Sequence, residues 1–225
     1  MENTAQLAKS IEDLAKWMDA RMSEFENSQQ HAPSAGNPTV KVLSADYTNF
    51  KSLVWKSLAM LRSQLELIVN GLDRIETHSR RKVLLFHGLA EEDKEDLPKK
   101  INSLIQGKMK LSTVNADSVE VCHRLGVKRD KARPILVRFN TMKHRSAVWN
   151  AKTTLKGTKV SISEFLTKPR QDVFAAARKH FGKKHCWSSE GVIVILMPDG
   201  SRRKIVTVSE LRDLTALHPV TTSDG

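Results

Sequence analysis

The hydrophobic positions of this 225-residue chain change their period partway along its length. Between residues 44 and 79, apolar residues recur at alternating steps of four and three, which is the spacing of a heptad repeat. From Lys82 onward, short apolar runs typical of strands alternate with amphipathic segments typical of helices. The pattern therefore predicts an N-terminal helical stalk and a C-terminal globular part, which meet at residues 79–88.

The heptad repeat predicts a coiled-coil oligomerisation stalk over residues 44–79. Leucine occupies each a position and isoleucine two of the four d positions, a combination that shifts the preference from parallel dimers to trimers or tetramers. A single amphipathic helix packed on the globular part is the alternative interpretation. The seam residues, which we expect to form the oligomer interface, are Val54, Leu58, Leu61, Leu65, Ile68, Leu72 and Ile75.

Two further segments precede the stalk. Residues 1–27 carry apolar side chains at steps of four and three and predict an amphipathic helix. This helix either joins the oligomer or folds back on its own chain. Residues 28–43 contain two prolines and a glycine and show no such periodicity, so they predict a flexible linker.

Residues 80–166 predict a domain of the order strand, helix, strand, strand, helix, strand. Alternation directs Val119 and Val121 toward the core and leaves Leu136 and Arg138 on the open face of the sheet. The βαββαβ order is the split βαβ, ferredoxin-like arrangement of RNA-recognition motifs. Strands are expected at 82–87, 118–124, 134–139 and 158–163, with helices from about 97 and from 142 to about 156.

Residues 167–225 predict a small C-terminal domain of the order helix, strand, strand, strand, helix. Pro198-Asp199-Gly200 separates two apolar runs and is a strong hairpin signal, and strands are expected at 185–188, 192–197 and 203–208. Ser209 is expected to cap the last helix. The expected fold class is α+β, with an N-terminal coiled coil, an RNA-recognition-motif-like domain and a small α/β C-terminal domain.

Positive charge is concentrated in one part of the chain, whose formal net charge is +12. Residues 1–78 carry 8 basic and 10 acidic side chains, net −2, whereas residues 79–168 carry 20 and 9, net +11. Residues 169–225 carry 9 and 6, net +3. A local excess of this kind indicates an anionic partner, nucleic acid before a membrane surface.

The binding residues are expected to be basic side chains that line a cleft between the two globular domains. Base stacking on the four-stranded sheet is not expected, because the 134–139 strand keeps only the closing aromatic of the RNA-recognition signature. Arg145, Trp149 and Lys152 recur at helical spacing and suit phosphate pairing combined with base stacking; packing of Trp149 on a neighbouring domain or on the stalk is the alternative. The predicted binding residues are Arg124, Arg133, Arg138, Arg145, Trp149, Lys152, Arg170 and Arg178.

The sequence carries no pattern that indicates catalysis, a cofactor or a metal. The pairs Cys122-His123 and His185-Cys186 lack the CxxC or HxxxH spacing of a local metal clip. The acidic run at residues 91–96 is expected to complement the N-terminus of the following helix. No catalytic triad or glycine-rich phosphate loop is recognisable either. With two cysteines and no leader or membrane-spanning pattern, we expect an intracellular protein without a membrane partner.

Several motifs resemble known protein families. Segments similar to the baculovirus few-polyhedra (FP) protein are 162–167, 177–178 and 187–191. Segments that resemble the first-open-reading-frame proteins of long interspersed (non-LTR) retrotransposons are 79–89, 121–126, 133–139 and 155–158. The likeness covers residues 44 to about 217.

The resemblance implies a homotrimeric coiled coil and two domains that together clamp single-stranded RNA and act as a nucleic-acid chaperone. Arg138, Arg145 and Arg178 best match the arginines that contact RNA in the retrotransposon family. This chain departs from that family in its short stalk, broken at residues 28–40, and in the lack of an N-terminal zinc finger and a CCHC knuckle.

The expected function is non-enzymatic binding of single-stranded RNA, or of DNA, in a ribonucleoprotein of the cytoplasm or nucleus. The alternative is a coiled-coil scaffold or viral structural (FP-like) protein whose basic part binds acidic proteins. Neither function requires a cofactor or metal.

Overall fold

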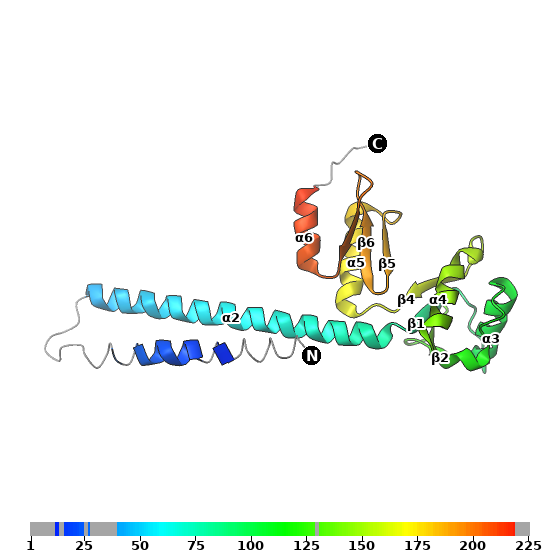
Figure 1. Ribbon diagram of the computed structural model, residues 1–225, viewed down its shortest axis with the longest axis horizontal. Helices are drawn as coiled ribbons and strands as arrows, with labels where there is room; N and C mark the ends of the chain where they lie inside the picture. The colour runs from blue at the N-terminus through cyan, green and yellow to red at the C-terminus, as the bar shows by residue number, and fades with distance from the viewer. Residues whose placement is uncertain (1–11, 14–15, 25–26, 28–39, 129–130, 219–225) are drawn as a thin grey trace. The chain divides into compact units, whose positions relative to one another are not determined.

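The computed structural model describes residues 12–13, 16–24, 27, 40–128 and 131–218. The expected α+β class is confirmed, since a long N-terminal helix precedes antiparallel sheets (Figure 1). The chain separates into two compact units, residues 1–74 and residues 75–225. Across the described residues, no helix is both long and apolar enough to span a bilayer.

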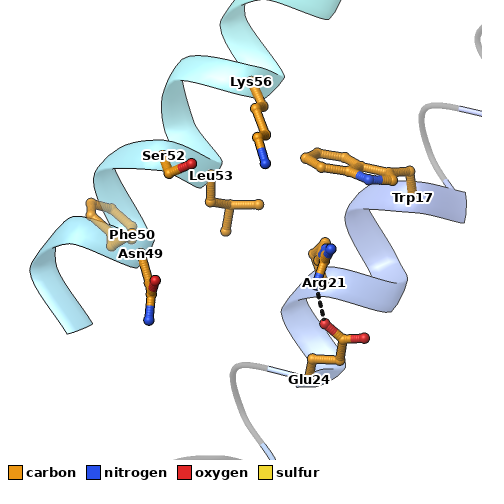
Figure 2. Close-up of a pocket in the computed structure, with 8 residues that line it drawn as sticks. All are labelled: Trp17, Arg21, Glu24, Asn49, Phe50, Ser52, Leu53 and Lys56. Carbon is orange, nitrogen blue, oxygen red and sulfur yellow. Dashed lines mark hydrogen bonds and ion pairs between the residues drawn. The ribbon is translucent and has the colours of Figure 1, made fainter. Parts of the chain in front are cut away.

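The described part of the first unit is helical. Residues 16–24 form a helix, and α2 spans Val40–Arg80, so residues 40–43 are helical and not linker as expected. A hollow of about 400 Å³ separates residues 16–24 from α2, and Figure 2 shows Trp17 and Lys56 facing each other across it. Leu7, Ile11, Leu14 and Phe25 of the expected amphipathic helix lie outside the described residues.

The heptad seam forms an exposed apolar stripe along α2. Leu58, Leu65 and Leu72 are 52%, 61% and 61% exposed, and Ile75 is 70% exposed. Ile68 is half-buried. An exposed apolar stripe of this length is typical of surfaces that bind another chain.

Residues 83–164 form a four-stranded antiparallel sheet covered on one face by helices. Its core contains Leu84, Phe86 and Val137 from the sheet and Ile101 and Val148 from the helices, all fully buried. The strands lie in the order β2-β3-β1-β4. The elements in chain order are β1 (Val83–His87), α3 (Leu97–Ser103), β2 (Val119–Arg124), β3 (Ile135–Phe139), α4 (Met142–Asn150) and β4 (Ser161–Glu164).

Local hydrogen bonds fix where the two covering helices begin. The carboxylate of Asp96 accepts from the backbone N–H of Lys99 at 3.0 Å, and the Thr141 hydroxyl accepts from that of His144 at 3.2 Å. The helix α4 ends earlier than the expected residue 156, because the chain tightens into a 3₁₀ turn at Ala151–Leu155.

One expectation about the strand faces is wrong. The pairing of β2 with β3 shifts between Val119 and Val121, so that Val121 stands opposite Arg138 and is exposed, while Cys122 packs against the core. One additional residue in a β-bulge reverses the alternation in this way. Leu136 lies on the open face as expected, since it alternates with the core residues Ile135 and Val137, but it is only 8% exposed there.

The C-terminal part of the second unit is a three-stranded antiparallel sheet with two helices packed on one face. Its elements are α5 (Lys168–Phe181), β5 (Cys186–Ser189), β6 (Val192–Leu196), β7 (Arg202–Ile205) and α6 (Val208–Leu217). The helix α5 packs against β5 and β6 and also against α6 (Figure 1). The core contains Val173, Ala177, Ile193, Ile195 and Leu211.

The cap of α6 differs from the expected one. Thr207, and not Ser209, caps the helix: its hydroxyl accepts from the Glu210 N–H at 3.2 Å, and the Glu210 carboxylate accepts from the Thr207 N–H at 3.0 Å. This reciprocal pair is a capping box. It ends β7 at Ile205, earlier than the expected residue 208.

Candidate nucleic-acid interface

Two of the predicted binding arginines hold the acidic run at residues 91–96. The buried guanidinium of Arg124 donates to both carboxylate oxygens of Glu95, at 2.7 and 2.9 Å. Arg133 donates to the Glu91 carboxylate at 2.6 Å. The hydrogen bonds from Arg124 lower the pKa of Glu95 to about 2, and those from Arg133 lower the pKa of Glu91. Arg124 and Arg133 therefore fix the loop that precedes α3.

Arg145 is buried, so the prediction that it lies on an exposed helix face is wrong. Its side chain is 4% exposed and forms an ion pair with Glu164, whose side chain is 5% exposed. The two residues lie on α4 and at the end of β4. A buried charge requires such a partner, because an unpaired guanidinium would be costly to remove from water.

The same carboxylate also binds the turn between β5 and β6. The N–H groups of Glu190 and Gly191 donate to it at 2.8 and 3.2 Å. Both turn residues have positive φ, 54° and 81°, as a two-residue type I′ hairpin requires. Arg170, also buried, donates to the Gly191 carbonyl at 2.8 Å. We call Arg145, Glu164, Arg170 and the Glu190–Gly191 turn the Glu164 node.

Trp149 packs on the core of its own domain, which neither sequence interpretation anticipated. It is half-buried against the cluster that contains Val148. The ammonium of Lys152 lies 3.1 Å from its ring centroid, and the guanidinium of Arg145 lies 5.0 Å away. Burial lowers the pKa of Lys152. The fold therefore brings together Arg145, Trp149 and Lys152 as expected. The two cations already contact the Trp149 ring.

Arg138 and Arg178 are the predicted arginines with the greatest access to solvent. The Arg138 side chain is 44% exposed and lies 3.1 Å from the Glu120 carboxylate, on the sheet face away from the helices. Arg178 is exposed, and its guanidinium stacks 4.0 Å from the ring centroid of Phe174. Because Arg138 and Arg145 lie on opposite faces of the sheet, the predicted residues do not line one common cleft.

The C-terminal sheet carries an aromatic and basic surface that the sequence pattern did not predict. On the face away from α5 and α6, Trp187 pairs with Val194, and Val194 pairs with Lys204 on the far strand. Arg202 lies on the same face, with its guanidinium 5.8 Å from the Trp187 ring centroid. The alternation of residues 202–205 could have placed Arg202 and Lys204 together. Their proximity to Trp187 depends on the register of three strands.

Among the described residues, neither the two cysteines nor the potential metal ligands form a reactive-thiol or metal-binding site. Burial raises the pKa of Cys122 to about 11 and also raises that of Cys186, so both thiols are protonated at neutral pH. In the same described part of the chain, no three His, Cys, Asp or Glu side chains are grouped closely enough to hold a metal ion.

The Glu164 node predicts a large difference between a buried and an exposed ion pair. Glu164→Ala leaves Arg145 charged and unpaired, so the free energy of unfolding should fall by about 3–5 kcal/mol. The matched variant Glu120→Ala breaks the exposed pair with Arg138 and should cost less than about 1 kcal/mol. Urea unfolding followed by circular dichroism measures both. Equal losses in the two variants would contradict a structural role for Glu164.

The depressed pKa of Glu95 predicts a specific acid sensitivity. In the folded state the pKa of Glu95 is lowered from its ordinary value of 4.5 to about 2, so the carboxylate stays ionised in moderately acidic solution. Its contribution to stability is therefore complete above pH 4.5 and is lost as the pH falls toward 2. The stability difference between the parent and Glu95→Gln should shrink over that interval. Asp93→Asn, at a side chain 92% exposed, is the control. A pH-independent difference for Glu95→Gln would refute the assignment.

The chain was compared with models of known protein families. No family model matches the chain.

Proposed function

We propose that the protein is a non-enzymatic, oligomeric binder of single-stranded RNA. The observation that carries the proposal is the charge of residues 79–168, net +11, because it persists on the surface after the buried ion pairs are set aside. Exposed carboxylates in this segment are fewer than exposed cations among the described residues. The exposed cations are Arg81, Lys94, Lys99, Lys108, Lys110, Lys128, Lys131, Lys143, Lys156, Lys159 and Lys168.

The topology of the four-stranded unit supports nucleic acid as the anionic partner. The order β1, α3, β2, β3, α4, β4 and the sheet order β2-β3-β1-β4 agree with the split βαβ arrangement that RNA-recognition motifs use. We assign the unit to that class as part of the proposal. Since the sheet face presents Arg138 and few aromatics, its contacts are mainly to phosphate and weakly selective for sequence.

The exposed seam of α2 supports self-association through a homotrimeric coiled coil. Leucine at a and isoleucine at d favour three or four strands, and every seam side chain except the half-buried Ile68 is exposed in the single chain. Several basic units on one stalk would coat a long RNA as a ribonucleoprotein particle with chaperone activity. Later contacts become intramolecular, which raises avidity without any new contact.

Salt dependence tests the proposed function. In filter binding with an unstructured RNA, the logarithm of the affinity should fall linearly with the logarithm of salt concentration, by about 0.7 per phosphate contact. Arg138→Ala and Arg178→Ala should each reduce that slope by about one contact. Lys16→Ala removes the same charge from the first unit and should leave the slope unchanged. Salt-insensitive or absent RNA binding would instead favour a scaffold that binds acidic proteins.

The stalk gives a second prediction. Leu65→Asp combined with Leu72→Asp places charges in the seam, so light scattering should report a folded monomer. This monomer should keep weak binding to short oligonucleotides but lose roughly 10²–10⁴ in affinity for long RNA. Leu67→Asp, at a leucine 52% exposed but off the seam, is the control and should remain oligomeric. A monomeric double variant that binds long RNA as tightly as the parent would disprove the avidity role.

A further inference from the structure

The outer face of the C-terminal sheet carries an aromatic side chain, Trp187, beside the cations Arg202 and Lys204. A hollow of about 320 Å³ lies on this face, which falls in the lower part of the range for small-ligand sites, about 300–1,000 Å³. Its lining residues are Trp187, Ser189, Glu190, Val192, Val194, Arg202 and Lys204. The opposite face of the same sheet is filled by the core with α5 and α6.

The strand register aligns an aromatic, an aliphatic and a cationic residue in one row. Trp187 stands directly opposite Val194, and Val194 directly opposite Lys204. Neighbouring strands lie about 4.8 Å apart, so the backbones of Trp187 and Lys204 are separated by about 10 Å. Val194 is buried between them and forms an apolar floor. An aromatic plane and a cation at this separation match a ligand with a flat ring at one end and an anion at the other.

The charges of the hollow favour an anion over a cation or a neutral partner. Arg202 lies across β6 from Trp187, with its guanidinium 5.8 Å from the ring centroid, and Lys204 adds a second positive charge. Glu190 supplies the carboxylate in the lining, and its backbone N–H is held by Glu164 in the β5–β6 turn. Both cations are exposed, so they can reach a ligand from the open face.

We propose that this face is a subsite for one nucleotide of a single-stranded nucleic acid, with the base stacked on Trp187 and the adjoining phosphates held by Arg202 and Lys204. The inference rests on the proposed function and deepens it. Base stacking on an aromatic side chain is tolerant of sequence, because every base presents a π face. The subsite would therefore add affinity for bases to a protein whose other contacts are to phosphate.

The test compares Trp187→Ala with its parent on two ligands: a single-stranded RNA and an abasic phosphodiester of equal length. Loss of one stacked base should weaken RNA binding by about 5- to 150-fold. Binding of the abasic ligand should stay within about twofold of the parent. Trp187→Phe should retain most of the RNA affinity, because it keeps an aromatic plane. Trp55→Ala, at an exposed tryptophan of the first unit, is the matched control and should bind both ligands normally.

The roles of Arg202 and Lys204 are tested separately, through the salt dependence of binding. Lys204→Ala and Arg202→Ala should weaken binding of both ligands and reduce the salt slope. Circular dichroism melting and light scattering check that each variant folds and keeps its oligomeric mass. As a measurement that needs no alanine variant, Trp187 fluorescence, isolated by Trp→Phe changes at positions 17, 55 and 149, should be quenched by RNA and not by the abasic ligand.

The outcomes separate this inference from the proposed function. If the parent binds RNA but folded Trp187→Ala binds both ligands like the parent, the subsite is disproved and the proposed function stands. A loss that is equal for RNA and the abasic ligand, a changed oligomeric mass, or an absence of quenching also overturns the subsite. If the parent itself binds no RNA, the proposed function fails and the subsite fails with it.

Discussion

The second unit depends on one buried carboxylate, that of Glu164. It neutralises Arg145 on α4 and accepts two backbone N–H groups from the β5–β6 turn, while Arg170 holds the carbonyl of the same turn. Position 191 requires glycine, because its φ is 81° and an added Cβ would lie 2.6 Å from the Cγ2 atom of Thr77. Loss of the Glu164 carboxylate would leave both a buried guanidinium and two backbone N–H groups without their acceptor, so the members of the node stabilise the fold together.

The structure divides the basic residues into two groups with different roles. Arg124, Arg133, Arg145 and Arg170 are engaged with carboxylates and carbonyls inside the fold, which makes them stabilising residues in the free protein. The exposed lysines and arginines keep their charge available to an external anion, and this group carries the proposed function. A +11 segment thus does not translate directly into a count of phosphate contacts.

The helices and strands could be predicted from the sequence where a local pattern of apolar residues determines them. The side chains that come together in the candidate site could not. Apolar spacing placed α2 and the strands of the core, because periodicity reports which face of an element is buried. The burial of Arg145 depends on Glu164, 19 residues along the chain, which no local spacing reveals. The bulge at Glu120 reversed the faces of Val121 and Cys122 for a similar reason. Trp187, Arg202 and Lys204 come together only through the register of three strands.

The most direct test of the account is photo-crosslinking of the purified protein to a single-stranded RNA, with the crosslinked peptides identified by mass spectrometry. If the basic second unit binds RNA, crosslinks should fall within residues 75–218 and should include the β5–β7 strands around Trp187. They should decline together as the salt concentration rises, because phosphate contacts supply most of the affinity. Crosslinks confined to residues 1–74, or none at low salt, would contradict the account.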